Sequence, residues 1–205
     1  MSIEHAPVAA AIAILLACPG YAQEPKPGDP AGVPRFKVEV VGDSMADFTA
    51  RVSAYVELRS ELMKGLPSLT VDDPAEVRKA VHALASRIRV ARARAKRGDI
   101  FTPMISREMK NVLRLHMDDS TWADLTDDNP GEIAKRVNGS YPEERPFSTV
   151  PANILALLPR LPPDIEYRFL GPHLSLLDTR ASLIVDWIPY AIQCAASDDK
   201  SKCYR

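Results

Sequence analysis

The side chains best suited to chemistry in this chain are four histidines, which are widely separated: His5, His82, His116 and His173. A metal site needs ligands at short spacings, and no two of these histidines lie three or four residues apart. The chain also lacks a Gly-x-Ser-x-Gly turn, a phosphate-binding loop and a dinucleotide fingerprint. The sequence therefore predicts no catalytic residue, no cofactor site and no metal ligand.

Two polar residues interrupt apolar helical stripes, and they are the candidates for a polar pocket. Arg59 falls inside the stripe of a helix predicted over residues 47–64. An arginine there either extends its charge to solvent along its stem or meets a carboxylate, and the first outcome is the commoner. His116 lies on the apolar face of another predicted helix, where a partly buried structural histidine is commoner than a base. If both residues met an acid such as Asp186, they would form a polar pocket in the core.

The amino-terminal segment has the pattern of an export signal. Residues 7–17 are continuously apolar but too few to cross a bilayer, which takes about 20 residues. Gly20 and Ala22 are small residues at the positions that a signal peptidase reads, so cleavage is expected after Ala22. The alternative is the lipobox that ends at Cys18, which would place a lipid anchor there. Either route gives a periplasmic or secreted protein that is not transmembrane after processing.

Export changes how the cysteines are interpreted. Once residues 1–22 are removed, Cys194 and Cys203 remain as a pair in an oxidising compartment. A disulfide between them would close a short loop over the polar carboxy-terminal segment, and such bridges stabilise by about 2–4 kcal/mol. The alternative is two free thiols.

Charge is balanced over the whole chain but unevenly distributed along it. The sequence has 26 basic and 27 acidic residues, with a basic excess in residues 74–117 and six acids in residues 118–132. We expect the acidic segment to lie across the basic helices and compensate them, which argues against a nucleic-acid partner. Anionic lipid or a cell-wall polymer is the alternative partner for the basic residues. The acids lack the one-three-five spacing of a calcium loop.

Periodicity and turn residues predict an α+β protein. We expect an antiparallel three-helix amino-terminal bundle, then short helices, then a small three-stranded antiparallel β-meander. The predicted segments are a signal peptide (1–22), a flexible proline-rich leader with a short strand at 36–41 (23–46), the helical bundle (47–117), an acidic connection with a short helix (118–150), a helix plus meander (151–193) and a tail with the cysteine pair (194–205).

Capping and breaking residues set the bounds of the predicted elements. Asp73 precedes Pro74 at the start of the second helix, and Asn129 precedes Pro130 at the start of a short one. The predicted helices cover residues 47–64, 74–97, 102 or 103 to 116, 130–137 and 151–158. The predicted strands cover residues 165–170, 174–177 and 182–188.

Several of these segments resemble an uncharacterised family of exported bacterial proteins. The likeness is carried by residues 158–163 (Leu-Pro-Arg-Leu-Pro-Pro), 166–171 (Glu-Tyr-Arg-Phe-Leu-Gly), 176–180, 183–186, 98–103 and 127–132, so it covers most of the mature chain. It implies export and no known activity. The final strands are also similar to the carboxy-terminal module of periplasmic nickel/cobalt-homeostasis accessory proteins. This chain has no histidine cluster, so that likeness transfers no metal ligands.

The sequence thus favours an exported, non-catalytic protein that binds an unknown envelope or extracellular partner. The absence of any compact catalytic motif is the main reason. The alternatives are an exported hydrolase-like enzyme with a dispersed site, or a metal-responsive periplasmic protein.

Expression of the full chain in a Gram-negative host tests the export prediction. The protein should lose residues 1–22 and begin at Gln23, because Gly20 and Ala22 occupy the positions read by the peptidase. Intact-mass measurement of the envelope and periplasmic fractions checks this. An acylated amino terminus that disappears in Cys18→Ala would show the lipid anchor instead. An unprocessed chain found only in the cytosolic fraction would contradict both routes.

Overall fold

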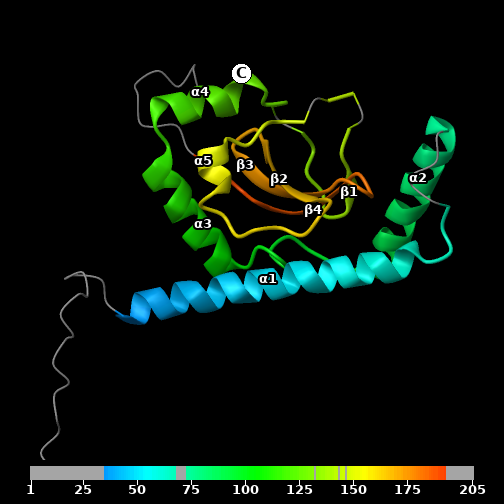
Figure 1. The fold of residues 1–205 in the computed structure, drawn as a ribbon, viewed down its shortest axis with the longest axis horizontal. Coiled ribbons are helices and arrows are strands. Elements are labelled where there is room, and N and C mark those ends of the chain that lie inside the picture. Colours follow the sequence, from blue (N-terminus) through cyan, green and yellow to red (C-terminus); the bar gives the residue numbers. More distant parts are fainter. Residues whose placement is uncertain (1–34, 68–72, 132, 143, 146, 193–205) are drawn as a thin grey trace, which may run out of the picture. The chain divides into compact units, whose positions relative to one another are not determined.

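The computed structural model describes residues 35–67, 73–131, 133–142, 144–145 and 147–192. The predicted signal peptide with Cys18, residues 23–34 of the leader, and the pair Cys194 and Cys203 lie outside the described residues. Helices and an antiparallel sheet are both present, so the α+β class is confirmed (Figure 1). None of the helices in the described residues is long and apolar enough to cross a membrane.

The described residues form five helices and four strands in a mixed order. The helices are α1 (Arg35–Met63), α2 (Pro74–Ala91), α3 (Pro103–His116), α4 (Asp119–Asp127) and α5 (Ala152–Leu155). The strands are β1 (Gly139–Ser140), β2 (Ile165–Leu170), β3 (His173–Asp178) and β4 (Leu183–Ile188). All neighbouring strands are antiparallel, and their order in the sheet is β1-β4-β3-β2. The sheet therefore has four strands rather than the three expected.

The helices do not form the expected three-helix bundle. α1 contacts both α2 and α3, but these two lie toward opposite ends of α1, with the sheet above it (Figure 1). The main core joins α1, α2 and α3 to one face of the sheet, through residues such as Phe48, Leu84, Ile105 and Phe169. Phe48, Leu84 and Ile105 belong to the predicted stripes and are buried, whereas His116 of the third stripe is exposed. These apolar helix faces pack against the sheet. Helical periodicity shows which face of a helix is buried but not what it packs against.

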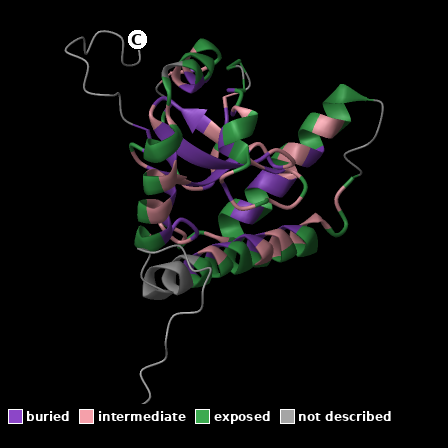
Figure 2. Cartoon of the chain, turned by 60° about the vertical axis from the view of Figure 1, so that its left-hand side comes forward, coloured by how far each residue is buried: buried purple, intermediate pink, exposed green. Residues whose placement is uncertain are grey.

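The other face of the sheet is also covered. Tyr141 and Ile133, from the segment around β1, pack against Leu170, Leu177 and Ile184. Every residue of β3 is buried, because this strand is central and has packing on both faces. Figure 2 shows the buried residues gathered in the strands and in the helix faces turned toward them.

Two predictions about the amino-terminal half were wrong: the strand at residues 36–41 and the end of the second helix. Residues 36–41 were expected to be extended but belong to α1. β-branched residues lower helix propensity by only tenths of a kcal/mol, and extending an existing helix needs no new nucleus. The second helix ends at Ala91, not near residue 97, because Arg92 turns away and exchanges hydrogen bonds with Asn138. These tertiary bonds replace the last turns of the predicted helix.

The acidic connection also differs from the prediction. The described residues of 130–137 are not helical, because Gly131 has a φ of 74° and Asn129 accepts hydrogen bonds from Gly131 N–H and Gly171 N–H. A helix lies earlier instead, as α4. Asp118 caps it by accepting the Thr121 N–H at 2.7 Å, and Leu125 is buried. Four-residue α5 is shorter than the predicted 151–158 helix.

Two arginine side chains of α2 donate hydrogen bonds to backbone carbonyls and to a hydroxyl. Arg87 donates to the carbonyls of Leu62 and Lys64 at the end of α1. Arg89 donates to the carbonyl of Asn138 and to the hydroxyl of Ser140. A cation at a helix carboxy terminus is favourable because the helix dipole is negative there. These described contacts dock α2 on α1 and on β1, which is a different use of the arginines from the expected pairing with the acidic segment.

Replacing Phe48 by alanine should destabilise the fold strongly. The ring is fully buried and stacks on Phe101 at 5.3 Å and on Tyr167 at 6.4 Å between ring centroids, so it joins α1 to the sheet. We expect a loss of about 3–5 kcal/mol of unfolding free energy, measured by urea denaturation. Val90→Ala is the control, because Val90 is 77% exposed, and it should change stability by less than about 0.5 kcal/mol. Equal effects of the two substitutions would contradict this packing.

Candidate functional site

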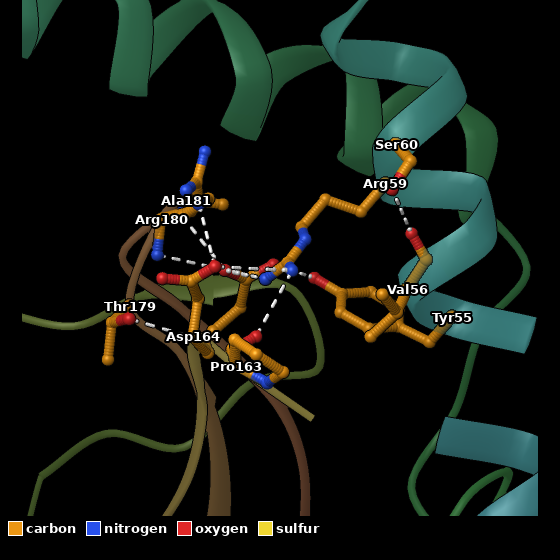
Figure 3. A network of polar contacts seen from close by, with 10 residues as sticks. Tyr55, Val56, Arg59, Ser60, Pro163, Asp164, Thr179, Arg180 and Ala181 are labelled. Carbon is orange, nitrogen blue, oxygen red and sulfur yellow. Dashed lines mark hydrogen bonds and ion pairs between the residues drawn. The ribbon is translucent and has the colours of Figure 1, made fainter. Parts of the chain in front are cut away.

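A buried polar cluster lies between α1 and the end of β3, and Asp178 is its centre. This carboxylate is fully buried and accepts hydrogen bonds from the Tyr55 hydroxyl at 2.6 Å and from Arg59 Nη1 at 3.1 Å. It also accepts the backbone N–H groups of Arg180 at 2.9 Å and Ala181 at 3.1 Å. Figure 3 shows these donors converging from α1 and from the turn that joins β3 to β4.

A second acid extends the cluster toward its rim. Asp164 lies 3.6 Å from Arg59 Nη2 and accepts a 2.7 Å bond from Arg180 Nε. Arg59 also donates to the carbonyl of Pro163 at 3.3 Å (Figure 3). The backbone carbonyl of Asp164 accepts the Thr179 N–H at 2.9 Å. The link before β2 is thereby fastened to the β3–β4 turn.

Local sequence accounts for this arrangement. Tyr55 and Arg59 are four residues apart, so they share one face of α1. An aspartate at the start of a turn readily accepts N–H groups two or three residues further on, as Asp178 does. Burial, followed by the charge of Asp178, raises the pKa of the Tyr55 phenol. Tyr55 therefore stays protonated and donates to the carboxylate.

The chemistry that this cluster can perform is structural. Asp178, Arg59 and Tyr55 have 0%, 5% and 4% of their surface exposed, so a reactant has little access to them. Their donors and acceptors are largely used by one another, except that Arg59 Nε is buried and unpaired. We therefore describe these residues as the α1–β3 clamp, a polar connection between the helix and the sheet.

The structure does not bring the two predicted pocket residues together. Arg59 meets the carboxylates of Asp178 and Asp164 rather than reaching solvent, which is the less favoured of its two expected outcomes. His116 is exposed at the end of α3, where its Nδ1 lies 2.9 Å from the carbonyl of Val112. The buried face of α3 is formed by Ile105, Met109 and Leu113, and His116 lies outside it.

Asp186, the acid proposed to join them, has another role. It is fully buried in β4 and accepts backbone N–H groups from Gly98, Ile100 and Phe101. A carboxylate that accepts three N–H groups of one loop holds that loop in place, and here it holds the connection between α2 and α3. The sequence of residues 98–103 did not predict this contact, because the contact joins positions 85 or more residues apart.

His116 does line a surface hollow of about 490 Å³. Its other lining residues come from the α3–α4 junction and from α5: Leu115, Met117, Asp118, Asn153 and Leu157. None of the described residues that line this hollow is a serine, threonine or cysteine, the nucleophiles commonest in hydrolases.

The outer edge of β2 is the second candidate site. Thr179 N–H bonds to the carbonyl of Asp164, so the even-numbered residues of β2 face β3 in the antiparallel ladder. The odd-numbered residues must then direct their N–H and C=O groups outward. The Ser148 hydroxyl satisfies both outward groups of Phe169, at 3.0 and 2.8 Å, and the carbonyl of Pro162 accepts the Ile165 N–H.

Tyr167 lies between these two protected positions. Its outward N–H and C=O have no hydrogen-bond partner within the residues that the structure describes. Its side chain is buried, with the hydroxyl bonded to the carbonyl of Pro159 at 3.1 Å. Burial raises the pKa of this phenol too. The unpaired groups are therefore those of the main chain.

A groove of about 520 Å³ lies at the same place. Its lining includes Tyr167 together with Glu166 and Arg168, which point to the opposite face of the sheet. A hollow bordered by both faces of one strand runs along the edge of that strand. The remaining lining is mostly apolar and comes from the segments on either side: Thr149, Val150, Leu155, Pro159, Arg160, Leu161 and Ile165. We call this hollow the β2-edge groove.

The opposite edge of the sheet is closed. β1 is two residues long, and Arg89 from α2 bonds to the carbonyl of Asn138 and to Ser140 beside it. Covered or very short edges prevent unwanted strand pairing. The β2-edge groove is thus a place, among the described residues, where a hollow and free main-chain groups of this sheet coincide.

Comparisons with protein-family models, with curated proteins and with solved structures found no match. The resemblance noted in the sequence remains a prediction, and the site must be judged on its own geometry.

Substituting Tyr55 tests the α1–β3 clamp. Tyr55→Phe removes one hydrogen bond to a buried carboxylate, and we expect a loss of about 1.5–3 kcal/mol in urea denaturation at neutral pH. Tyr190→Phe is the matched control, because Tyr190 is 60% exposed and should change stability by less than about 0.5 kcal/mol.

The same variant should alter the pH dependence. Because the Tyr55 pKa is raised by folding, the stability it contributes is complete below the ordinary tyrosine pKa of 10.0. Above that pH the unfolded chain loses the proton and the folded chain keeps it, so stability falls by up to about 1.4 kcal/mol per pH unit for this group. Tyr55→Phe should show a shallower fall than the wild type. Identical slopes would contradict a buried neutral Tyr55.

Proposed function

We propose that this protein is an exported, non-catalytic binding protein that holds an extended peptide segment of a partner in the β2-edge groove. The observation that carries the proposal is the pair of outward main-chain groups of Tyr167, which have no partner in the described residues and lie beside the groove. Free main-chain N–H and C=O groups at a sheet edge are a template for pairing with another extended chain.

A peptide matches these groups better than most ligands. In an antiparallel pair, two opposing residues exchange both of their N–H···O bonds. One peptide residue would therefore satisfy the N–H and the C=O of Tyr167 together. Addition of a strand to an exposed sheet edge is a common mode of peptide recognition.

The length of the paired region is restricted. Ser148 occupies the outward groups of Phe169, and the carbonyl of Pro162 occupies the Ile165 N–H. A bound segment would thus pair at Tyr167 and leave the edge on either side. Side-chain contacts in the groove must supply the rest of the affinity.

Export is the second part of the proposal and rests on the sequence. The apolar segment 7–17 and the cleavage pattern ending at Ala22 support it, with lipidation at Cys18 as the alternative. In that compartment the partner would be an envelope or extracellular polypeptide. Catalysis is less well supported, because the α1–β3 clamp is buried and the hollow at His116 has no hydroxyl or thiol nucleophile in its lining.

Amide NMR of the mature chain, from Gln23 to Arg205, tests peptide binding at Tyr167. The probes are capped pentapeptides with one leucine in a glycine–serine background, each matched by a copy with N-methylated backbone. We expect saturable shifts of the Tyr167 amide with the unmodified peptides and none with the methylated ones, because methylation removes the donor. Leu155→Asp, at a 45% exposed groove residue, should weaken binding without unfolding the protein.

Two results would contradict the proposal. One is binding of the methylated peptides as tight as that of their unmodified partners. The other is a set of shifts that leaves the Tyr167 amide and its groove neighbours unchanged at saturating peptide.

A further inference from the structure

The charges around the β2-edge groove are not balanced. Arg168 lines the groove, but its guanidinium is paired with Glu166 and donates to the carbonyl of Ser148 at 2.9 Å. It also lies 5.5 Å from the centre of the Phe147 ring. The charges of Arg168 and Glu166 therefore offset each other and fasten the segment around Ser148 to β2.

Arg160 is the remaining cation. It is exposed in the link between α5 and β2, lines the groove, and makes no hydrogen bond or ion pair with any residue that the structure describes. With Arg168 and Glu166 offset, one positive charge is left at the groove. A bound segment with a negative charge would be attracted, and one with a positive charge would be repelled.

The rest of the groove lining is mostly apolar, so it favours an apolar side chain in the bound segment. Val150, Leu155, Pro159, Leu161 and Ile165 provide most of the wall. Leu155 is 45% exposed, and Phe147 beside Arg168 is 52% exposed, so large apolar side chains are left open to solvent at this place. Covering such surface contributes about 25 cal/mol per Å² buried.

We infer that the occupant is an acidic extended peptide, in which a large apolar side chain fills the groove and a neighbouring Asp or Glu side chain pairs with Arg160. This inference rests on the proposed function and adds the chemical class of the partner. Arg160 is then a specificity-determining residue, while Tyr167 supplies the main-chain contact common to every sequence.

A two-by-two binding experiment tests the role of Arg160. The probes are capped pentapeptides with one leucine and one glutamate in every relative order, each paired with a glutamine copy, and binding is measured by calorimetry at low salt. Wild-type protein should bind the best glutamate peptide about threefold to fivefold more tightly than its glutamine copy, the effect of an exposed ion pair. Arg160→Gln should bind both copies equally.

The control variant separates local pairing from general charge. Arg114→Gln removes another exposed arginine, on α3, and should retain the preference for glutamate. Added salt should reduce the preference of the wild type, because exposed charges are screened.

The failures of the inference and of the proposed function are distinguishable. If glutamate and glutamine peptides bind equally to the wild type and both shift the Tyr167 amide, the acidic specificity is wrong and peptide binding stands. If the preference persists in Arg160→Gln, another cation carries it and the inference is overturned. If no peptide of the panel binds or shifts Tyr167, both are wrong.

Discussion

The fold depends on a carboxylate that is enclosed between a helix and a sheet. Asp178 has no exposed surface, and its charge is compensated by Tyr55 and Arg59 from α1 and by two N–H groups of its own turn. Breaking such a pair from one side leaves an uncompensated buried charge and costs about 3–5 kcal/mol. A shift of α1 along the sheet by one helical turn would break the contacts with Asp178 in this way. The clamp therefore selects which turn of the long helix faces the sheet, a choice that apolar contacts alone leave open.

The sheet is the second constraint on the fold, and its two edges have different contacts. Arg89 of α2 binds the carbonyl of Asn138 and the hydroxyl of Ser140 beside β1, so this helix is held by polar contacts as well as by its apolar seam. The β2 edge is closed at both ends and open at Tyr167. Both faces are packed, which leaves the edge as the place where the main chain can meet another molecule.

Local patterns in the sequence predicted the elements better than their assembly. Strict alternation located β2, and the cap Asp73 located the start of α2. β1 is two residues long and carries no pattern, so a four-stranded sheet could not be anticipated. Arg59 was conspicuous inside an apolar stripe, but its partner lies 119 residues away, and only folding brings the two together. The groove was beyond prediction because it follows from strand order and from the hydrogen bonds of Ser148, neither of which periodicity encodes.

The hydroxyl of Ser148 has a consequence for solubility. The Ser148 hydroxyl donates to the carbonyl of Phe169 and accepts its N–H. It thereby takes the two hydrogen bonds that a neighbouring strand would otherwise make at this residue. An edge blocked at Phe169 pairs less readily with further chains, although β2 alternates apolar residues of high β-propensity with Glu166 and Arg168. The protein can thus keep one residue of its edge open to a partner while avoiding aggregation through the same strand. A proline or alanine at position 148 would remove that protection while leaving the apolar core unchanged.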